Sequence, residues 1–257
     1  MTEHCEQPLE GGNATDGVVR LGDTVRKPWG PTTLAVHELM RTVAAAGVDV
    51  PEPLGRDERG RQILEFVPGP LALRCPPLSL AELGRVGRLI RAIHDACEGF
   101  IPSAPAPWEP LLPAPGGEAD LVCHGDLTPW NLLLGERWVF IDWDEASPST
   151  RLWDLAYSAQ AFTLNDASAD PEESAARLAA LVDGYGADAA LRARLPRAMV
   201  ERTEAMHELL RTSHATGREP WGSMFVQGHG EHWRRAADHV ATHEALWARV
   251  LNGSTAE

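Results

Sequence analysis

A short acidic motif in the middle of the chain contains the residue types that phosphoryl transfer requires. Asp126 is followed five residues later by Asn131, and Asp142 ends an apolar run eleven residues further on. One carboxylate can orient an attacking hydroxyl and accept its proton, while an amide oxygen and a second carboxylate can hold Mg²⁺ on the phosphates of a nucleotide. Apolar stretches on both sides of the first two residues predict that they lie on a turn between short strands.

These residues resemble the aminoglycoside phosphotransferase family, whose members are small-molecule kinases with a protein-kinase-like fold. The resemblance rests on three runs of sequence, at residues 124–131 (HGDLTPWN), 141–144 (IDWD) and 153–156 (WDLA). It implies that His124 fixes the loop by packing and hydrogen bonding instead of reacting. It continues in weaker form toward the N-terminus and so covers most of the chain.

The resemblance also implies a role for each polar residue of the motif. Asp126 would be the catalytic base, and Asn131 and Asp142 would hold Mg²⁺. Asp154 would support the catalytic loop from below, although an aspartate before an apolar helix can also be an ordinary helix N-cap. Asp144 would be either a further metal-side or phosphate-side group or a solvated carboxylate.

Lys27 is the only lysine in the chain, whose other 22 basic residues are arginines. A compact ammonium retained at one place suits an anionic ligand, although an arginine-rich coding bias could leave a single lysine anywhere. Residues 24–27 are predicted to form a short strand, on which neighbouring side chains point to opposite faces. Only one of Arg26 and Lys27 can then reach a nucleotide, and we expect Lys27, with Arg26 as the alternative.

A helix is predicted from about Thr33 to just before Gly47, because apolar residues recur at three-four spacing and glycine favours the end of a helix. Glu38 is the one carboxylate on that helix. The family resemblance implies that Glu38 pairs with Lys27 to hold the α- and β-phosphates. The alternative is a charge on a solvated helix face.

Two backbone segments are predicted to contact the nucleotide. Gly11, Gly12 and Asn13 form a turn whose small residues would let backbone amides approach phosphate oxygens, or a plain hairpin turn. The strand that starts at Gln62 runs into a proline-glycine break, and in the kinase fold backbone groups near Phe66 and Val67 would bind adenine there.

We therefore expect an α+β, protein-kinase-like two-lobed fold. Residues 1–67 would form the nucleotide-binding lobe, a small antiparallel sheet with one helix. Residues 68–257 would form a larger, mainly helical catalytic and acceptor-binding lobe. A capping box at residues 79–82 opens its first long helix, and helices are predicted at residues 173–185, 191–213 and 231–251.

Composition and charge limit the partners. The net charge of −14 argues against nucleic acid, and the twelve acidic and two basic residues between 118 and 173 would favour a cationic acceptor, unless they only keep the surface soluble. There is neither an apolar run long enough to span a membrane nor a secretion signal, and the four cysteines lack metal-ligand spacing, so we expect free thiols in the cytoplasm. Histidines 229, 232, 239 and 243 could bind a metal, but a polar helix face is favoured.

The leading hypothesis is an ATP- or GTP- and Mg²⁺-dependent phosphotransferase that acts on a hydroxyl of a small, cationic molecule. An aminoglycoside, a basic peptide antibiotic, an amino alcohol or a sugar would each fit. The alternative is a kinase-fold binding or immunity protein that sequesters a toxic compound or peptide without transferring phosphate. A protein kinase is disfavoured, because the eleven residues between Asp142 and Asp154 leave no room for an activation loop.

Overall fold

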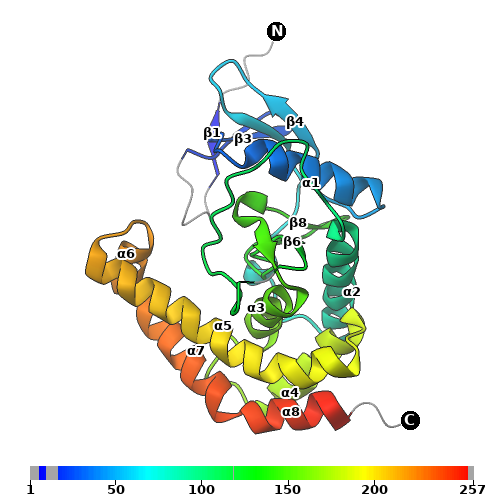
Figure 1. The fold of residues 1–257 in the computed structure, drawn as a ribbon, viewed down its shortest axis with the longest axis vertical. Coiled ribbons are helices and arrows are strands. Elements are labelled where there is room, and N and C mark those ends of the chain that lie inside the picture. Colours follow the sequence, from blue (N-terminus) through cyan, green and yellow to red (C-terminus); the bar gives the residue numbers. More distant parts are fainter. Residues whose placement is uncertain (1–5, 10–16, 118, 254–257) are drawn as a thin grey trace.

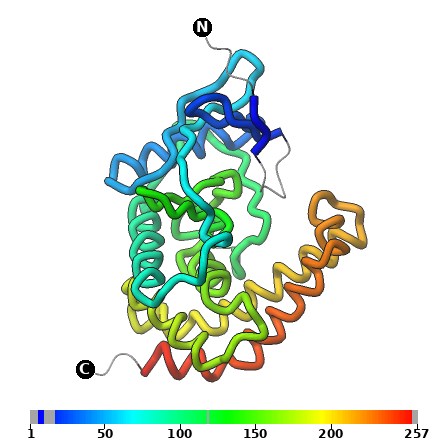
Figure 2. Tube along the Cα trace, turned by 180° about the vertical axis from the view of Figure 1, so that it is seen from behind, coloured from blue at the N-terminus to red at the C-terminus, as the bar shows by residue number. Residues whose placement is uncertain are grey.

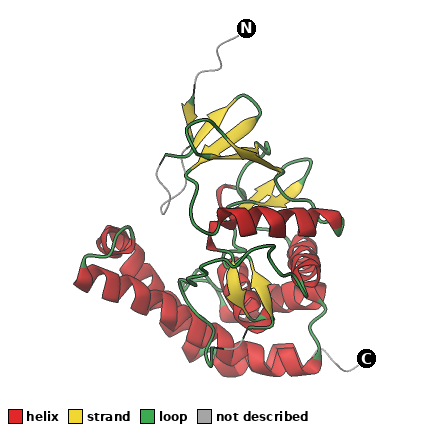
Figure 3. Cartoon of the chain, turned by 45° about the horizontal axis from the view of Figure 1, so that its top comes forward, coloured by secondary structure: helices red, strands yellow, loops and turns green. Residues whose placement is uncertain are grey.

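The computed structural model describes residues 6–9, 17–117 and 119–253. A five-stranded antiparallel sheet lies at one end of the molecule and helices fill most of the remainder (Figures 1 and 3). In space the strands follow the order β1-β2-β3-β5-β4. Their bounds are β1 Gln7–Pro8, β2 Val19–Leu21, β3 Thr24–Lys27, β4 Pro53–Arg56 and β5 Gln62–Glu65.

Helix α1 (Thr33–Ala45) lies beside this sheet (Figure 1). It buries Val36, Leu39, Met40 and Val43, the residues whose spacing predicted the helix. The chain leaves the helix at Gly47, whose φ of +85° is accessible to glycine at little cost. The predicted helix is therefore confirmed.

The chain then descends from the sheet into the helical part, as the rear view shows (Figure 2). It passes a single turn, η1 (Ala72–Arg74), and enters α2 (Leu80–Cys97). The predicted capping box is present, because Ser79 and Glu82 exchange side-chain to backbone hydrogen bonds. Helix α2 packs closely on α4 (Pro171–Tyr185), where a Cβ on Gly87 would come within 2.1 Å of the Leu181 carbonyl oxygen.

Two short hairpins and a helical turn frame the acidic motif. Strand β6 pairs with β9, and β7 pairs with β8, both antiparallel. Strands β6 and β7 are the short strands that the sequence predicts on either side of Asp126 and Asn131. The elements of this region are β6 Leu121–Cys123, β7 Leu132–Leu134, β8 Trp138–Phe140, η2 Trp143–Glu145 and β9 Ser147–Ser149.

From Pro171 to Gly253 the chain is mainly helical, as predicted. Helices α5 and α7 run side by side as an arm that ends at α6 (Figure 1). The helix predicted over residues 231–251 is interrupted at His243, whose ring donates to the His239 carbonyl at 2.9 Å. The elements are α3 Arg151–Thr163, α4 Pro171–Tyr185, α5 Ala189–Thr216, α6 Trp221–Met224, the π-helical turn η3 Phe225–His229, α7 Gly230–Thr242 and α8 Glu244–Gly253.

None of the helices that the structure describes combines the length and the apolar run that crossing a bilayer requires.

Candidate active site

The loop between β6 and β7 is held against η2 by a close backbone contact. Gly125 has a φ of +84°, and a Cβ at this position would lie 2.7 Å from the Glu145 carbonyl oxygen. A side chain here would be strained by its backbone conformation and would also clash with the neighbouring chain. Glycine therefore lets the loop pack directly on the segment that carries Asp142.

Asp126 lies half-buried in the wall of a cavity of about 620 Å³. Its carboxylate accepts hydrogen bonds from Asn131 Nδ2 at 2.7 Å, Trp130 Nε1 at 3.1 Å and Thr128 Oγ1 at 3.1 Å. Burial raises the pKa of Asp126 to about 7; the Asp142 charge adds to this, and the bonds from Trp130 and Thr128 oppose it. A carboxylate with this pKa can accept a proton near neutral pH.

Asn131 and Asp142 are brought together by the β7–β8 hairpin, and both line the same cavity as Asp126. The Ile141 amide donates to the Asn131 carbonyl at 2.8 Å, which fixes the two segments side by side. Among the described residues, Asp142 is the one non-glycine residue with a positive φ, at 65°. Such strained conformations occur often at functional sites, and here the conformation sets the direction of the carboxylate.

The oxygen donors of these two residues suit a hard cation. Asn131 Nδ2 donates to the carbonyl and to the carboxylate of Asp126, which leaves the amide oxygen of Asn131 for another partner. Carboxylate and amide oxygens are the ligands that Mg²⁺ prefers in proteins. The residues present therefore fit a Mg²⁺ site.

Lys27 reaches this site from the sheet. Its ammonium lies 2.5 Å from Asp142 and 2.7 Å from Asp144, whereas Arg26 points elsewhere and lies 3.6 Å from Asp57. Burial acts to lower the pKa of Lys27, and the charges of Asp144 and Asp142 outweigh it, so the pKa is above its ordinary value. Lys27 is thus protonated, and it is the one of the two basic side chains that faces the acidic motif.

The predicted Lys27–Glu38 pair is not formed in this structure. The Glu38 carboxylate accepts hydrogen bonds from the Ser103 amide, at 2.8 Å, and from the Ser103 hydroxyl. The rotation of α1 turns His37 toward the sheet instead, where its ring lies 3.1 Å from Gln62 Oε1. The carboxylate partners of Lys27 are Asp142 and Asp144, which follow β8, and not Glu38 on α1.

The segment predicted to contact adenine makes its described contacts within the protein. The Phe66 amide donates to the Asp23 carbonyl at 2.9 Å, and the Arg20 guanidinium stacks over the Phe66 ring at 3.7 Å. Val67 is buried against Leu133 and Val139. The predicted phosphate-covering turn, made of Gly11, Gly12 and Asn13, lies outside the described residues.

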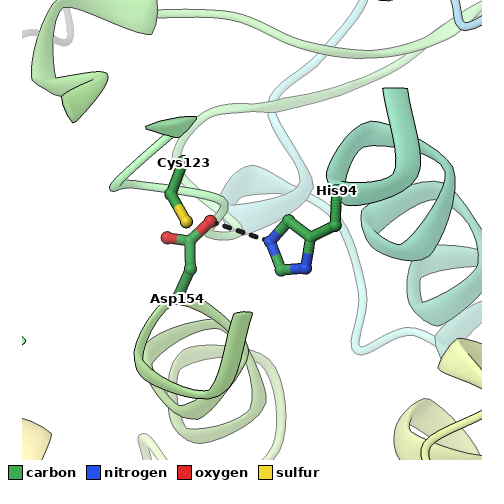
Figure 4. A group of neighbouring side chains, drawn as sticks. All are labelled: His94, Cys123 and Asp154. Carbon is green, nitrogen blue, oxygen red and sulfur yellow. Dashed lines mark hydrogen bonds and ion pairs between the residues drawn. The ribbon is translucent and has the colours of Figure 1, made fainter. Parts of the chain in front are cut away.

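Asp154 makes two hydrogen bonds, one to the loop that carries Asp126 and one to α2. One carboxylate oxygen accepts from the Gly125 amide at 3.2 Å, and the other lies 3.0 Å from His94 Nε2 (Figure 4). The opposite ring nitrogen of His94 lies 2.9 Å from the Tyr185 hydroxyl. The N-cap of α3 is Thr150, so Asp154 is not the helix cap that the sequence left open.

The thiol of Cys123 lies beside this pair, and the three side chains could in principle hold a metal ion (Figure 4). Both ring nitrogens of His94 are already hydrogen-bonded, and burial raises the pKa of the Cys123 thiol well above its usual value, which disfavours the thiolate that metals bind. The group is a buried hydrogen-bond chain. No second metal-ligand group occurs in the part of the chain that the structure describes, and the histidines of the C-terminal helices form none.

His124 packs as expected. Its ring centroid lies 4.5 Å from that of Trp143, and Nδ1 accepts from the Asp126 amide at 3.2 Å. Burial lowers the pKa of His124 to about 4, so the ring is neutral and serves to fix the loop.

The sequence did not predict several groups of the cavity. Trp130, which binds the Asp126 carboxylate, lies inside the recognised motif but was not singled out. Arg202, from the middle of α5, has no local pattern that marks it. Residues from α3, α5, α6 and α7 form much of the cavity wall, among them Trp153, Tyr157, Arg202, Met206, Trp221 and Trp233.

The comparison with known proteins identifies the family. The sequence pattern of the phosphotransferase enzyme family matches residues 105–196, which include the whole acidic motif. The trifolitoxin immunity protein of Rhizobium leguminosarum bv. trifolii is 31% identical over 195 residues, or 69% of this chain and 73% of that protein. The chain belongs to the phosphotransferase enzyme family.

Solved structures confirm the fold expected of this phosphotransferase-family protein. A choline/ethanolamine kinase family protein from Mesorhizobium loti matches with a TM-score of 0.58 at 19% identity, over 96% of this chain and 92% of the other. A microcompartment-associated aminopropanol kinase matches with 0.59 at 16%, over 97% and 93%. An amicoumacin kinase in complex with AMP-PNP and Ca²⁺ matches with 0.59 at 13%, over 94% and 87%. The predicted kinase-like α+β fold is thus confirmed.

Proposed function

We propose that this family member is a phosphotransferase that moves the γ-phosphate of ATP or GTP, with Mg²⁺, to a hydroxyl of a small molecule. The observation that carries the proposal is the convergence of Asp126, Asn131 and Asp142 on one cavity, with Lys27 bound to the last of them. A protein that only binds has no physical need to hold these four groups together.

Each residue has a role in the proposal. Asp126 orients the acceptor hydroxyl and accepts its proton, and its raised pKa suits that task. Asn131 and Asp142 hold Mg²⁺, which would neutralise charge on the phosphates. Lys27 binds phosphate oxygens, and to do so it exchanges at least one of its contacts with Asp142 and Asp144.

The proposal extends to the two parts of the chain. Residues 1–67 form the nucleotide-binding lobe, in which Gly11, Gly12 and Asn13 cover the phosphates and the backbone near Phe66 and Val67 contacts the base. Residues 68–257 form the catalytic and acceptor-binding lobe. Since the Phe66 amide is bonded to Asp23, a contact with adenine would use the remaining backbone groups of that segment.

The acceptor is a small molecule that carries a cationic group. Asp126, Asp142, Glu145 and Asp154 all line the cavity, and carboxylates raise the local concentration of cations. Two of the similar structures are kinases named for amino alcohols, which agrees with an acceptor of this kind. The cavity of about 620 Å³ suits a small molecule better than a folded protein.

A second candidate is an immunity protein that sequesters a toxic compound or peptide without phosphoryl transfer. The similarity to a trifolitoxin immunity protein favours this candidate. The two candidates differ in one measurable property, because only the phosphotransferase consumes nucleotide when the compound is present.

The test is release of ADP and of GDP by the purified protein with Mg²⁺, each nucleotide, and a panel of cationic antibiotics, amino alcohols and sugars. Asp126→Ala serves as the blank, and Asp238→Asn, on the exposed face of α7, serves as a matched control. The proposal predicts acceptor-dependent release that the control keeps and the blank loses. Binding of a toxic compound with no nucleotide consumption would favour the immunity candidate.

A further inference from the structure

Helix α5 carries two buried arginines, Arg192 and Arg202, whose surroundings differ completely. Arg192 is 8% exposed and fully engaged: it binds Asp183 at 2.7 Å and donates to the carbonyls of Ala187 and Leu251. It ties α5 to its neighbours. Its guanidinium therefore has a structural role.

Arg202, at 6% exposure, has no hydrogen bond or ion pair to any residue that the structure describes, and its Nη1 is buried without a partner. Asp126, Glu145 and Asp154 lie near enough to interact with it through space, but none of them lies within the 4.0 Å of an ion pair. Burying an unpaired guanidinium is costly, and proteins generally avoid it. A group that is kept in this state is available to an outside ligand.

The orientation of Arg202 defines the kind of ligand. Its guanidinium lies 3.8 Å from the centroid of the Tyr157 ring and 5.8 Å from that of Trp153, so aromatic rings cover its face. Stacking of this kind leaves the N–H groups in the guanidinium plane for hydrogen bonds, and their fork matches a carboxylate. Arg202, Tyr157 and Trp153 all line the cavity that contains Asp126.

We propose that Arg202 binds a carboxylate of the acceptor and that the acceptor is a hydroxylated zwitterion, an amino acid or a short peptide. The proposal deepens the proposed function, on which it rests. The carboxylate lies on Arg202, and the ammonium lies toward Glu145 and the acidic motif. Trp130, Trp221 and Trp233 contact the apolar body of the molecule.

The other source of an anion is a phosphate of the nucleotide. Asp142 and Lys27, which we assign to the phosphates, lie on the catalytic segment and the sheet, whereas Arg202 belongs to the helical wall together with Tyr157 and Met206. This position favours the acceptor. The experiment separates the two sources by measuring each ligand alone.

The probes are L-serine, L-threonine, seryl-phenylalanine and threonyl-phenylalanine, each with a free carboxylate and as the C-terminal amide. Binding to the full chain is measured by tryptophan fluorescence, without nucleotide. Since bonds to charged groups are worth about twice those between neutral groups, we expect at least one probe to bind about 10- to 100-fold more tightly as the carboxylate than as the amide. Arg202→Gln abolishes this preference and Arg202→Lys keeps part of it.

Arg211→Gln, an exposed arginine on the same helix that pairs with Glu208, is the matched control and keeps the full preference. Thermal melting of all three variants shows whether they are folded. Equal binding of carboxylate and amide by the unsubstituted protein, absence of binding by every carboxylate probe, or a preference that survives Arg202→Gln would overturn the proposal. The proposal would also be overturned if Arg202→Gln lost Mg²⁺-ATP binding but kept the carboxylate preference. That result would assign Arg202 to a phosphate.

Because these measurements need no turnover, they separate the two proposals. Carboxylate binding that depends on Arg202, in a protein that releases no ADP, would leave the inference standing and remove the phosphotransferase. Acceptor-dependent ADP release that is the same with and without an acceptor carboxylate would leave the phosphotransferase standing and remove the inference.

Discussion

Two carboxylates lie at the same loop, one within it and one beneath it, and they differ in exposure. Asp154, beneath the loop, is 3% exposed, and each of its oxygens has one partner in the protein. Asp126, within the loop, is half-buried in the wall of the cavity, and its pKa is raised to about 7. Both carboxylates border the cavity and both are hydrogen-bonded within the protein, but the more exposed Asp126 is the one that can exchange partners with a ligand. The buried side of the loop is therefore structural, and the open side is the candidate for chemistry.

The strongest way to break this contrast is to remove the charge on the open side. Asp126→Asn should lower kcat by about 10²- to 10⁴-fold, because the base is lost while the amide keeps the shape. Binding of Mg²⁺-nucleotide should survive, since Asn131 and Asp142 are unchanged. Steady-state kinetics and calorimetry check the two parts. Near-normal turnover would show that the role of Asp126 is wrong.

His124, a buried residue of the same loop, should make the stability of the protein depend on pH. Its folded pKa of about 4 lies below the ordinary value of 6.5, so the unfolded state binds more protons between these limits. The stability from neutral His124 is fully present above pH 6.5 and is lost as the pH falls toward 4. The total is about 3 kcal/mol.

Urea unfolding at pH 7 and pH 5 measures this loss. His124→Gln should be less stable at pH 7 but should lose less on acidification than the unsubstituted protein. If both proteins lose the same free energy between the two pH values, His124 is not the group responsible.

The substitution Asp154→Ala tests the structural role of the buried carboxylate beneath the loop. The substitution leaves the Gly125 amide and the His94 ring without their partner, which should cost about 1–3 kcal/mol of stability. The pH dependence of the remaining turnover should not change, because Asp154 does not exchange protons with the acceptor. Denaturant unfolding and a pH–rate profile measure both effects, and an altered profile would place Asp154 in the chemistry.

The smallest effect is expected at Glu38, on the outer face of α1. Glu38→Gln should change stability by no more than about 0.5 kcal/mol, since the contact with Ser103 is exposed. Nucleotide affinity should also stay unchanged, because Lys27 pairs with Asp142 and Asp144 in place of Glu38. Calorimetric titration of Mg²⁺-ATP checks this, and a marked loss of affinity would restore the predicted pair.

The parts of the site that could be predicted from the sequence are those formed by residues close together in the chain. Asp126, Asn131 and Asp142 lie within seventeen residues, so the family resemblance locates all three in one short stretch of the chain. Lys27 was found because it is the one lysine. The Lys27–Glu38 pair is not formed because it depends on how α1 is rotated against the sheet, and the adjacent His37 faces the sheet instead.

The residues on the acceptor side of the cavity could not be predicted, because packing between distant helices brings them together. Arg202 reaches the cavity only because α5 packs on α3 and places it over Tyr157. These contacts join residues more than forty positions apart, and helical periodicity indicates that a face is buried without saying what it is buried against. The unpaired state of Arg202 is likewise visible only once every neighbour has been placed.

The most direct test of the central claim is detection of the phosphorylated acceptor itself. The purified protein is incubated with Mg²⁺-ATP and an acceptor that stimulates ADP release, and the small-molecule products are analysed by mass spectrometry alongside Asp126→Asn and Asp142→Asn. We predict a phosphorylated acceptor with the unsubstituted protein and a nearly complete loss of it in both variants. Product formation that continues in Asp126→Asn, or ADP release with no phosphorylated acceptor, would contradict the assignment of this cavity as a phosphotransfer site.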